Sequence, residues 1–247
     1  MPDTATSERL AFRQGIIDQP ADYIRRKVFA DWLQEHGERE EAETWRAAAP
    51  AFFTGLDLGQ AADFSALVVV ERHVIPNLAR PTGTQYAFDV RHLHRWALKT
   101  PYPQVVSDTK ALFSKSPLQR STLAVDETGV GRPVVDMFRA AKIECTLRPF
   151  SITCGSAVTG RTVAKKHLVG AIQSPLCSGR LRFAAGLPLT PMLTKELETF
   201  QVTVDESTRN ESFAAWRNAD HDDLVLALAL ALHVASVAPF RFDIISG

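Results

Sequence analysis

The chain has 247 residues, of which 45% are hydrophobic and 23% are charged, and its 28 Lys/Arg residues balance its 28 Asp/Glu residues. This composition excludes a wholly disordered chain and is typical of one globular domain with a small appendage. No signal peptide is expected, the longest apolar run (residues 224–232) is too short to cross a membrane, and three cysteines without a CxxC pair favour a cytoplasmic location without a zinc site or disulfides.

The first 50 residues differ in texture from the remainder. They carry 7 Lys/Arg against 10 Asp/Glu, and apolar residues recur at helical spacing at Ile24, Val28, Phe29, Trp32 and Leu33. Gly37 is expected to end that helix, and a second short helix is expected over residues 40–49. We therefore predict a small helical N-terminal segment over residues 1–50, which serves docking or packing.

Residues 51–240 have the pattern of an α/β domain. Apolar, β-branched runs at residues 52–59 and 64–74 predict a strand hairpin, and a third strand follows from residue 84. The rest of the chain alternates between strands and helices: helices over 102–113, 132–142, 163–173 and 189–200, strands near 121–131, 143–150 and 179–184, a late hairpin after 200, and a closing helix after Asp220. This order predicts a mixed sheet flanked by helices on both faces.

Acidic residues stand at the ends of several predicted elements. Asp57 ends the first strand, Asp126 ends the strand before a glycine turn, and Asp220, Asp222 and Asp223 open the last helix. Acids at the ends of buried strands are uncommon unless a cation compensates them. If the strands of Asp57 and Asp126 are neighbours, their carboxylates and those of the last helix would bind Mg²⁺ or Mn²⁺, which prefer oxygen ligands.

The acids before the last helix have a second interpretation. Asp220 and Asp223 have the spacing of a capping arrangement, and acids in a first helical turn also suit the helix dipole. Capping alone does not account for three acid positions in this order, and both roles remain open for residues 220–223.

Six stretches together resemble the nuclease domain of phage terminase large subunits. They are "GLDLGQAADFSALVVVER", "TPYPQVVSDTKALF", "LAVDETGVGRPVVDMF", "KKHLVGAIQSPLCSGRLRF", "LTKELETFQV" and "NADHDDLVLALALAL". The resemblance spans residues 52–236 and implies an RNase H-like fold. It also implies a DNA endonuclease that hydrolyses phosphodiester bonds with two metal ions.

The resemblance assigns roles to particular residues. Asp57 and Asp126 would be metal ligands and catalytic residues, with Asp223 the first choice for the third position, Asp222 close behind and Asp220 a further candidate. Four basic residues are candidates for contacts with DNA phosphates, with solvated surface charge as their alternative role: Lys165, Lys166, Arg180 and Arg182.

Two departures from the terminase pattern affect the expected function. Residues 155–162, "GSAVTGRT", have the spacing of a phosphate-binding loop but place Arg161 where the lysine belongs, so no ATPase motor is expected in this chain. The stretch "RRKVFADWLQEHGEREEAE" in the N-terminal segment resembles a small bacterial repeat-companion domain. A role in DNA packaging would then require a separate ATPase motor or portal-type partner.

Other functions remain open at the level of sequence. "GLDLG" also opens the phosphate-binding hairpin of ATP-binding proteins of the actin and sugar-kinase fold, although threonine or serine usually follows where this chain has "QAAD". A catalytically inactive relic that binds DNA or a protein partner is another alternative. Within the nuclease interpretation, a preference for branched DNA, as in junction resolvases, is also open.

Overall fold

The computed structural model describes residues 4–59, 63–80, 82–129, 131–153, 160–199, 203–204, 211–212 and 222–238. The chain forms two compact units. A helical unit comprises residues 1–51, 72–88 and 238–247, and a sheet unit comprises residues 52–71 and 89–237. The predicted division into residues 1–50 and 51–240 stays a prediction.

The N-terminal part of the helical unit contains the helices α1 (Thr4–Asp18), α2 (Tyr23–Glu35) and α3 (Arg39–Ala47). The sequence predicted α2 and α3 but not α1. Of the residues at helical spacing in α2, Phe29 and Leu33 are fully buried, whereas Ile24 and Val28 are exposed. Arg26 is buried in their place, because its guanidinium donates a hydrogen bond of 2.7 Å to the carbonyl of Ala48.

A seven-stranded sheet is the framework of the second unit. Its strand order is β6-β5-β4-β1-β2-β3-β7. The strands are β1 (Ala51–Asp57), β2 (Ala66–Pro76), β3 (Thr84–Arg95), β4 (Thr122–Asp126), β5 (Thr146–Thr153), β6 (Thr162–Ala164) and β7 (Leu181–Phe183). A separate two-stranded ladder joins β8 (Thr203–Val204) to β9 (Glu211–Ser212).

The sheet is mixed, as the sequence predicted. β1, β4, β5 and β6 pair in parallel. β1, β2 and β3 are neighbours joined by loops of eight residues or fewer (58–65 and 77–83), too short for the crossover that a parallel pair requires. Because β1 and β4 are parallel neighbours, their carboxyl ends lie at the same edge of the sheet.

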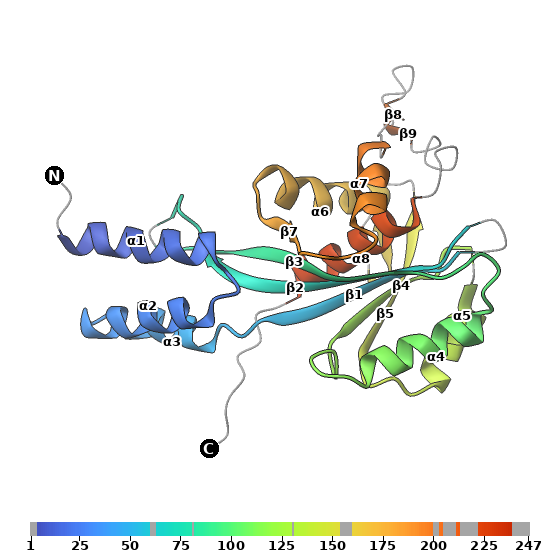
Figure 1. Cartoon of the computed structure of the whole chain (residues 1–247), viewed down its shortest axis with the longest axis horizontal. Coiled ribbons are helices and arrows are strands. Elements are labelled where there is room, and N and C mark those ends of the chain that lie inside the picture. Colours follow the sequence, from blue (N-terminus) through green and yellow to red (C-terminus); the bar gives the residue numbers. More distant parts are fainter. Residues whose placement is uncertain are drawn as a thin grey trace. The chain divides into compact units, whose positions relative to one another are not determined.

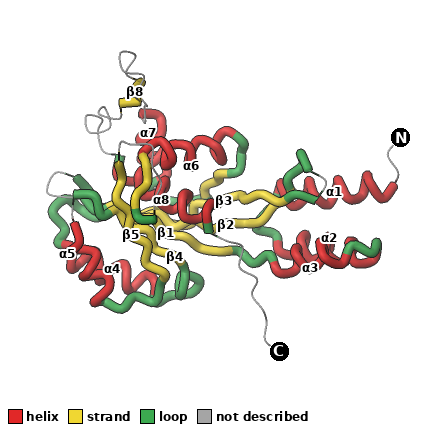
Figure 2. The backbone as a smooth tube through the Cα atoms, turned by 180° about the vertical axis from the view of Figure 1, so that it is seen from behind, coloured by secondary structure: helices red, strands yellow, loops and turns green. Residues whose placement is uncertain are grey.

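Helices cover both faces of the sheet (Figures 1 and 2). On one face, α4 (Tyr102–Phe113) and α5 (Gly131–Ala140) pack on Leu56, Leu123 and Val125 in one hydrophobic core. The other face carries α6 (Lys165–Cys177), α7 (Thr190–Thr199) and α8 (Asp223–Val237). Twelve of the fifteen residues of α8 are buried. None of the helices in the described ranges has the length and apolarity needed to cross a membrane.

Candidate metal centre

Two of the predicted acids end neighbouring parallel strands. Asp57 is the last residue of β1 and Asp126 is the last residue of β4. Leu56 pairs in register with Val125, so the two aspartates lie next to each other at the carboxyl edge of the sheet. Because side chains alternate along a strand and Leu56 and Val125 face the core beneath α4 and α5, both aspartates face the side of α8.

The position of α8 brings a third acid to the same edge. Gly55 lies against α8 so closely that a β-carbon at this position would stand 1.9 Å from the carbonyl oxygen of Ala227. Asp223 lies one helical turn before Ala227, and Asp57 lies two residues after Gly55 on the same face of the sheet. The rise of one helical turn nearly equals the length of two strand residues. Asp223 on α8 therefore lies next to Asp57 on β1.

The pKa of Asp57 reflects the carboxylates around it. Asp57, Asp126 and Asp223 are 9%, 7% and 3% exposed. Burial raises the pKa of Asp57 well above its ordinary value, and the negative charges of Asp126, Asp223, Asp222 and Asp63 raise it further, in that order. Such a group of buried acids favours a divalent cation, because a cation removes both the repulsion and the cost of burial.

Asp126 is held by the turn that follows it. Its carboxylate accepts a hydrogen bond of 2.7 Å from the backbone N–H of Thr128 and a second from the Thr128 hydroxyl. Burial is the larger effect and raises the pKa of Asp126 to about 6, while these hydrogen bonds and the ammonium group of Lys165 lower it. Lys165 is the first residue of α6. Because its charge acts on Asp126, this predicted DNA-binding residue lies beside the acids.

Sequence reasoning missed Glu196, an acid on the buried face of α7. Its Oε2 accepts hydrogen bonds from the backbone N–H groups of Leu224 and Val225, at 3.0 and 3.1 Å. Burial raises the pKa of Glu196 to about 7, and the charge of Asp223 adds to this shift while Arg95 opposes it. The signal in the sequence was a charged residue next to Leu197 and three positions after Leu193, on the apolar face of the predicted helix.

Arg95 is a second residue that sequence reasoning missed. It ends β3, and its guanidinium lies 4.0 Å from the ring centroid of Phe64, in the loop between β1 and β2. The next residue, Trp96, donates its backbone N–H to the carbonyl of Ser65 in that loop. Arg95 therefore stands at the same edge of the sheet as Asp57.

The other predicted DNA-binding residues have different surroundings. Lys166 is exposed on α6 beside Lys165. Arg180 donates to the hydroxyls of Ser178 and Ser174 at the end of α6. Arg182 forms an ion pair of 3.0 Å with the buried Asp89, so its charge compensates an acid of the sheet.

Two sequence features lie partly outside the described residues. Asp220, the further candidate ligand, is outside them, as are residues 154–159 of the stretch that imitates a phosphate-binding loop. At the end of that stretch, Arg161 pairs with Glu127 at 2.6 Å. This ion pair gives Arg161 a structural partner on the turn after Asp126.

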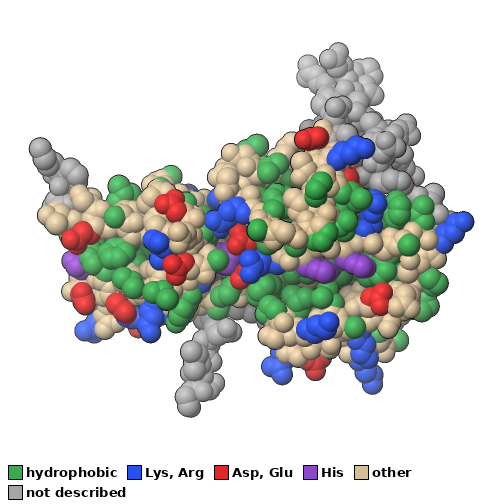
Figure 3. All heavy atoms as spheres, viewed as in Figure 1, with side chains coloured by type: hydrophobic (Ala, Val, Ile, Leu, Met, Phe, Trp, Pro, Cys, Tyr) green, Lys and Arg blue, Asp and Glu red, His purple; other side chains and the backbone are tan. Residues whose placement is uncertain are grey.

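A row of rings lies at the end of β3, on the face opposite Arg95. It consists of His92, His94 and Trp96. The rings of His92 and His94 stack with centroids 6.3 Å apart, and His94 meets the ring of Trp96 edge-on at 4.4 Å. Histidine side chains lie side by side on the surface of the sheet unit in Figure 3, where acidic and basic side chains are interspersed. This row is separated from the acids by the sheet itself.

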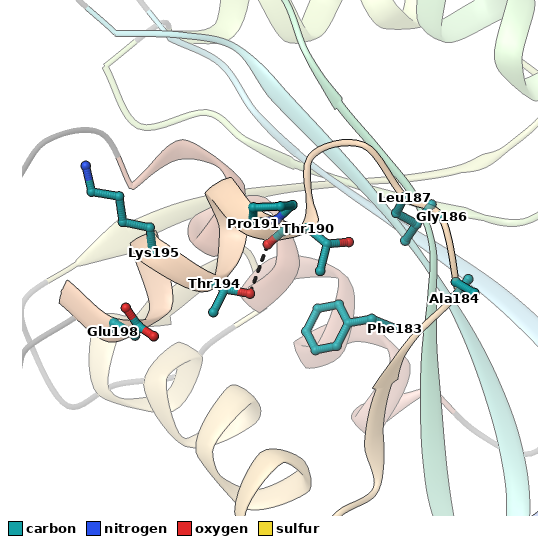
Figure 4. Close-up of a pocket in the computed structure, with 10 residues that line it drawn as sticks. Phe183, Ala184, Gly186, Leu187, Thr190, Pro191, Thr194, Lys195 and Glu198 are labelled. Carbon is teal, nitrogen blue, oxygen red and sulfur yellow. Dashed lines mark hydrogen bonds between the residues drawn. The ribbon is translucent and has the colours of Figure 1, made fainter.

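A pocket of about 690 Å³ lies between the end of β7 and the outer side of α7 (Figure 4). Phe183, Pro191 and Leu187 line it together with Thr194 and Lys195. Glu196 and Leu193 point to the other side of α7, where they are buried. The lining of this pocket includes none of the predicted metal ligands.

The fold resembles solved nuclease structures. The large terminase nuclease from thermophilic phage G20c superposes with a TM-score of 0.52 and 21% identity, over 74% of this chain and 81% of that chain. The chain has the large-terminase nuclease fold. This confirms the α/β, RNase H-like prediction and the resemblance seen in the sequence, while the likeness of the N-terminal segment to a repeat-companion domain stays a prediction.

Two further structures show weaker similarity. The large terminase of bacteriophage HK97 gives a TM-score of 0.48 with 14% identity, over 81% of this chain and 50% of that chain. RuvC from Thermus thermophilus gives 0.35 with 13% identity, over 74% and 92% of the two chains. No family model matches the chain, and no curated protein is significantly similar to it in sequence.

Proposed function

We propose that the chain is a metal-dependent DNA endonuclease that hydrolyses phosphodiester bonds at the carboxyl edge of its sheet. The observation that carries this proposal is the convergence of Asp57, Asp126 and Asp223 from two adjacent strand ends and the start of a buried helix. The fold supports this proposal, because a solved structure that the chain resembles is a large terminase nuclease.

The donor set fits Mg²⁺ or Mn²⁺. Asp57, Asp126 and Asp223 would be the ligands, with Asp222 beside them, and all of them offer carboxylate oxygens. Bound by these residues, such ions would supply an activated water molecule and would stabilise the leaving oxygen of a phosphodiester. The protein holds the acids rigidly, through the strand register for Asp57 and Asp126 and through the packing of α8 on Gly55 for Asp223.

Two basic residues flank the acids and would contact the DNA backbone. Lys165 lies beside Asp126, and Arg95 lies near Glu196, which is the neighbour of Asp223. Arg95 rests on the face of Phe64, which fixes a guanidinium fork well suited to phosphate oxygens. If the chain acts in DNA packaging, it would work together with an ATPase motor and a portal.

The test is cleavage of supercoiled plasmid in Mn²⁺, in Mg²⁺ and in EDTA. We expect nicking with either metal and none in EDTA, and a loss of at least about 100-fold in rate for Asp57→Ala and for Asp126→Ala. Asp136→Ala is the matched control, because Asp136 is an exposed acid on α5 paired with Arg139. A folded wild-type protein that cleaves no DNA with any divalent metal would exclude the endonuclease and favour a binding relic.

A further inference from the structure

The first turn of α8 is capped by a residue from another helix. The first N–H groups of any helix lack partners within the helix and need acceptors from elsewhere. In this protein the carboxylate of Glu196 accepts from the N–H groups of both Leu224 and Val225, although it lies 28 and 29 residues before them. At these two groups the cap comes from α7, whereas the capping arrangement predicted for Asp220 with Asp223 includes a residue outside the described ranges.

The cap is built into the interior of the sheet unit. Glu196 is 5% exposed, and Leu193, one turn earlier on the same face of α7, is fully buried. A buried carboxylate requires compensation, and the positive end of the α8 dipole supplies it together with the two hydrogen bonds. A rigid acceptor at this place fixes the direction and the register of the first turn of α8.

The residue held by this turn is the third acid of the metal centre. Asp223 is the first residue of α8, immediately before the two capped N–H groups. The side chains of Asp222 and Asp223 contribute negative charge at Asp57. The cap from α7 therefore anchors the turn of α8 that carries Asp223.

We propose that Glu196 is a positioning residue, which caps α8 and thereby places the carboxylate of Asp223 against those of Asp57 and Asp126. This inference rests on the proposed function. It requires an oxygen acceptor at position 196 and not a negative charge, because the contacts of Glu196 with α8 are hydrogen bonds from backbone N–H groups.

Two substitutions separate these requirements. Glu196→Gln keeps a carbonyl oxygen that accepts both hydrogen bonds, and Glu196→Ala removes the acceptor. If Glu196→Ala does not fold, Glu196→Asp is used in its place. The aspartate side chain is one methylene shorter, so its carboxylate is expected to fall short of the two N–H groups of α8. Glu198→Ala is the matched control, because Glu198 is an exposed acid on the same helix.

The measurements are Mn²⁺ affinity by calorimetry, the kcat and KM of plasmid nicking, and hydrogen exchange of the Leu224 and Val225 amides. For Glu196→Ala we expect at least about 10-fold weaker Mn²⁺ binding, a lower kcat with an unchanged KM for DNA, and at least about 10-fold faster exchange of the two amides. Glu196→Gln and Glu198→Ala should stay within about 2-fold of the wild type in all three measurements.

Three results would overturn the inference. Wild-type Mn²⁺ affinity in Glu196→Ala would mean that the cap is structural only. An equal loss of Mn²⁺ affinity in Glu196→Gln and Glu196→Ala would mean that the charge of Glu196 binds metal directly. Unchanged amide exchange in Glu196→Ala would mean that Glu196 does not hold the turn, and this readout remains decisive even if the wild-type protein proves to bind no metal and the proposed function fails.

Discussion

Gly55 and Ala227 touch backbone to backbone across the interface between β1 and α8. A β-carbon on Gly55 would lie 1.9 Å from the carbonyl oxygen of Ala227 and 2.7 Å from the backbone nitrogen of Ala231. Real β-carbons do not approach other atoms so closely, so only glycine permits this packing. The contact sets the depth at which α8 lies on the sheet, and with it the height of Asp223 above Asp57.

Gly55→Ala is expected to push α8 away from β1. The added methyl group would meet helix backbone, which cannot move aside as the end of a flexible side chain can. The free energy of unfolding should therefore fall by about 1–3 kcal/mol or more. Mn²⁺ binding should weaken in the variant that remains folded, because Asp223 moves with the helix. Urea unfolding and calorimetry measure the two effects.

Gly170→Ala is the matched control for this substitution. Gly170 lies within α6, and a β-carbon there would meet no atom within 4 Å. Alanine should therefore stabilise α6 by about 0.5–1 kcal/mol through its higher helix propensity. Equal stability of Gly55→Ala and the wild type would show that α8 is not held at the depth described.

The metal-free protein should lose stability as the pH rises. The pKa of Asp126 is about 6 and that of Glu196 about 7, against ordinary values of 3.8 and 4.5. Because folding raises both values, the folded state is favoured by protonation. This contribution is complete below the ordinary values and is lost as the pH passes through the folded values. The loss for Asp126 is at most about 3 kcal/mol, at about 1.4 kcal/mol for each pKa unit.

Urea unfolding in EDTA between about pH 4 and about pH 8 measures this loss. Asp126→Asn removes the titrating group but keeps an acceptor for Thr128, so its stability should depend less on pH than that of the wild type. Added Mn²⁺ should oppose the loss at the upper end of the range, where the carboxylates are ionised. The same pH dependence in the wild type and in Asp126→Asn would contradict the assignment.

Lys165→Ala and Arg95→Ala are each expected to weaken DNA binding without removing metal ligands. Each loss of a phosphate contact should reduce the slope of log affinity against log salt by about 1. Fluorescence anisotropy with a duplex in Ca²⁺ at several salt concentrations measures this slope. Arg139→Ala, on α5, is the control, and a slope in Arg95→Ala equal to that of the wild type would remove Arg95 from the DNA path.

Arg182→Ala should act mainly on stability. Its ion pair with Asp89 compensates an acid that is only 9% exposed, and truncation should cost about 1–2 kcal/mol after allowance for the partial exposure of the arginine. The double variant Arg182→Ala/Asp89→Asn should recover most of that loss, because it no longer buries an uncompensated charge. A drop in DNA affinity at unchanged stability would instead support the contact with DNA predicted from the sequence.

The sequence predicted much of the local structure because the signals are local. Apolar runs and helical spacing predicted the strands from β1 to β5, the helices α4 to α8 and the late ladder. Asp57 and Asp126 stood out because acids at the ends of apolar strands are unusual. Helical spacing did not show which side of α2 is buried. Ile24 and Val28 are exposed, whereas Arg26 lies in the core of the helical unit, where the carbonyl of Ala48 accepts a hydrogen bond from its guanidinium.

What the sequence by itself determined is which residues carry chemistry and which elements carry those residues. Only the tertiary structure decided which of them meet. The pairing of Leu56 with Val125 brings two aspartates together, Gly55 admits α8 to the depth that adds a third, and Glu196 reaches across 28 residues to cap that helix. Such relationships join segments distant in the chain, and a single sequence does not show which distant segments will pack together.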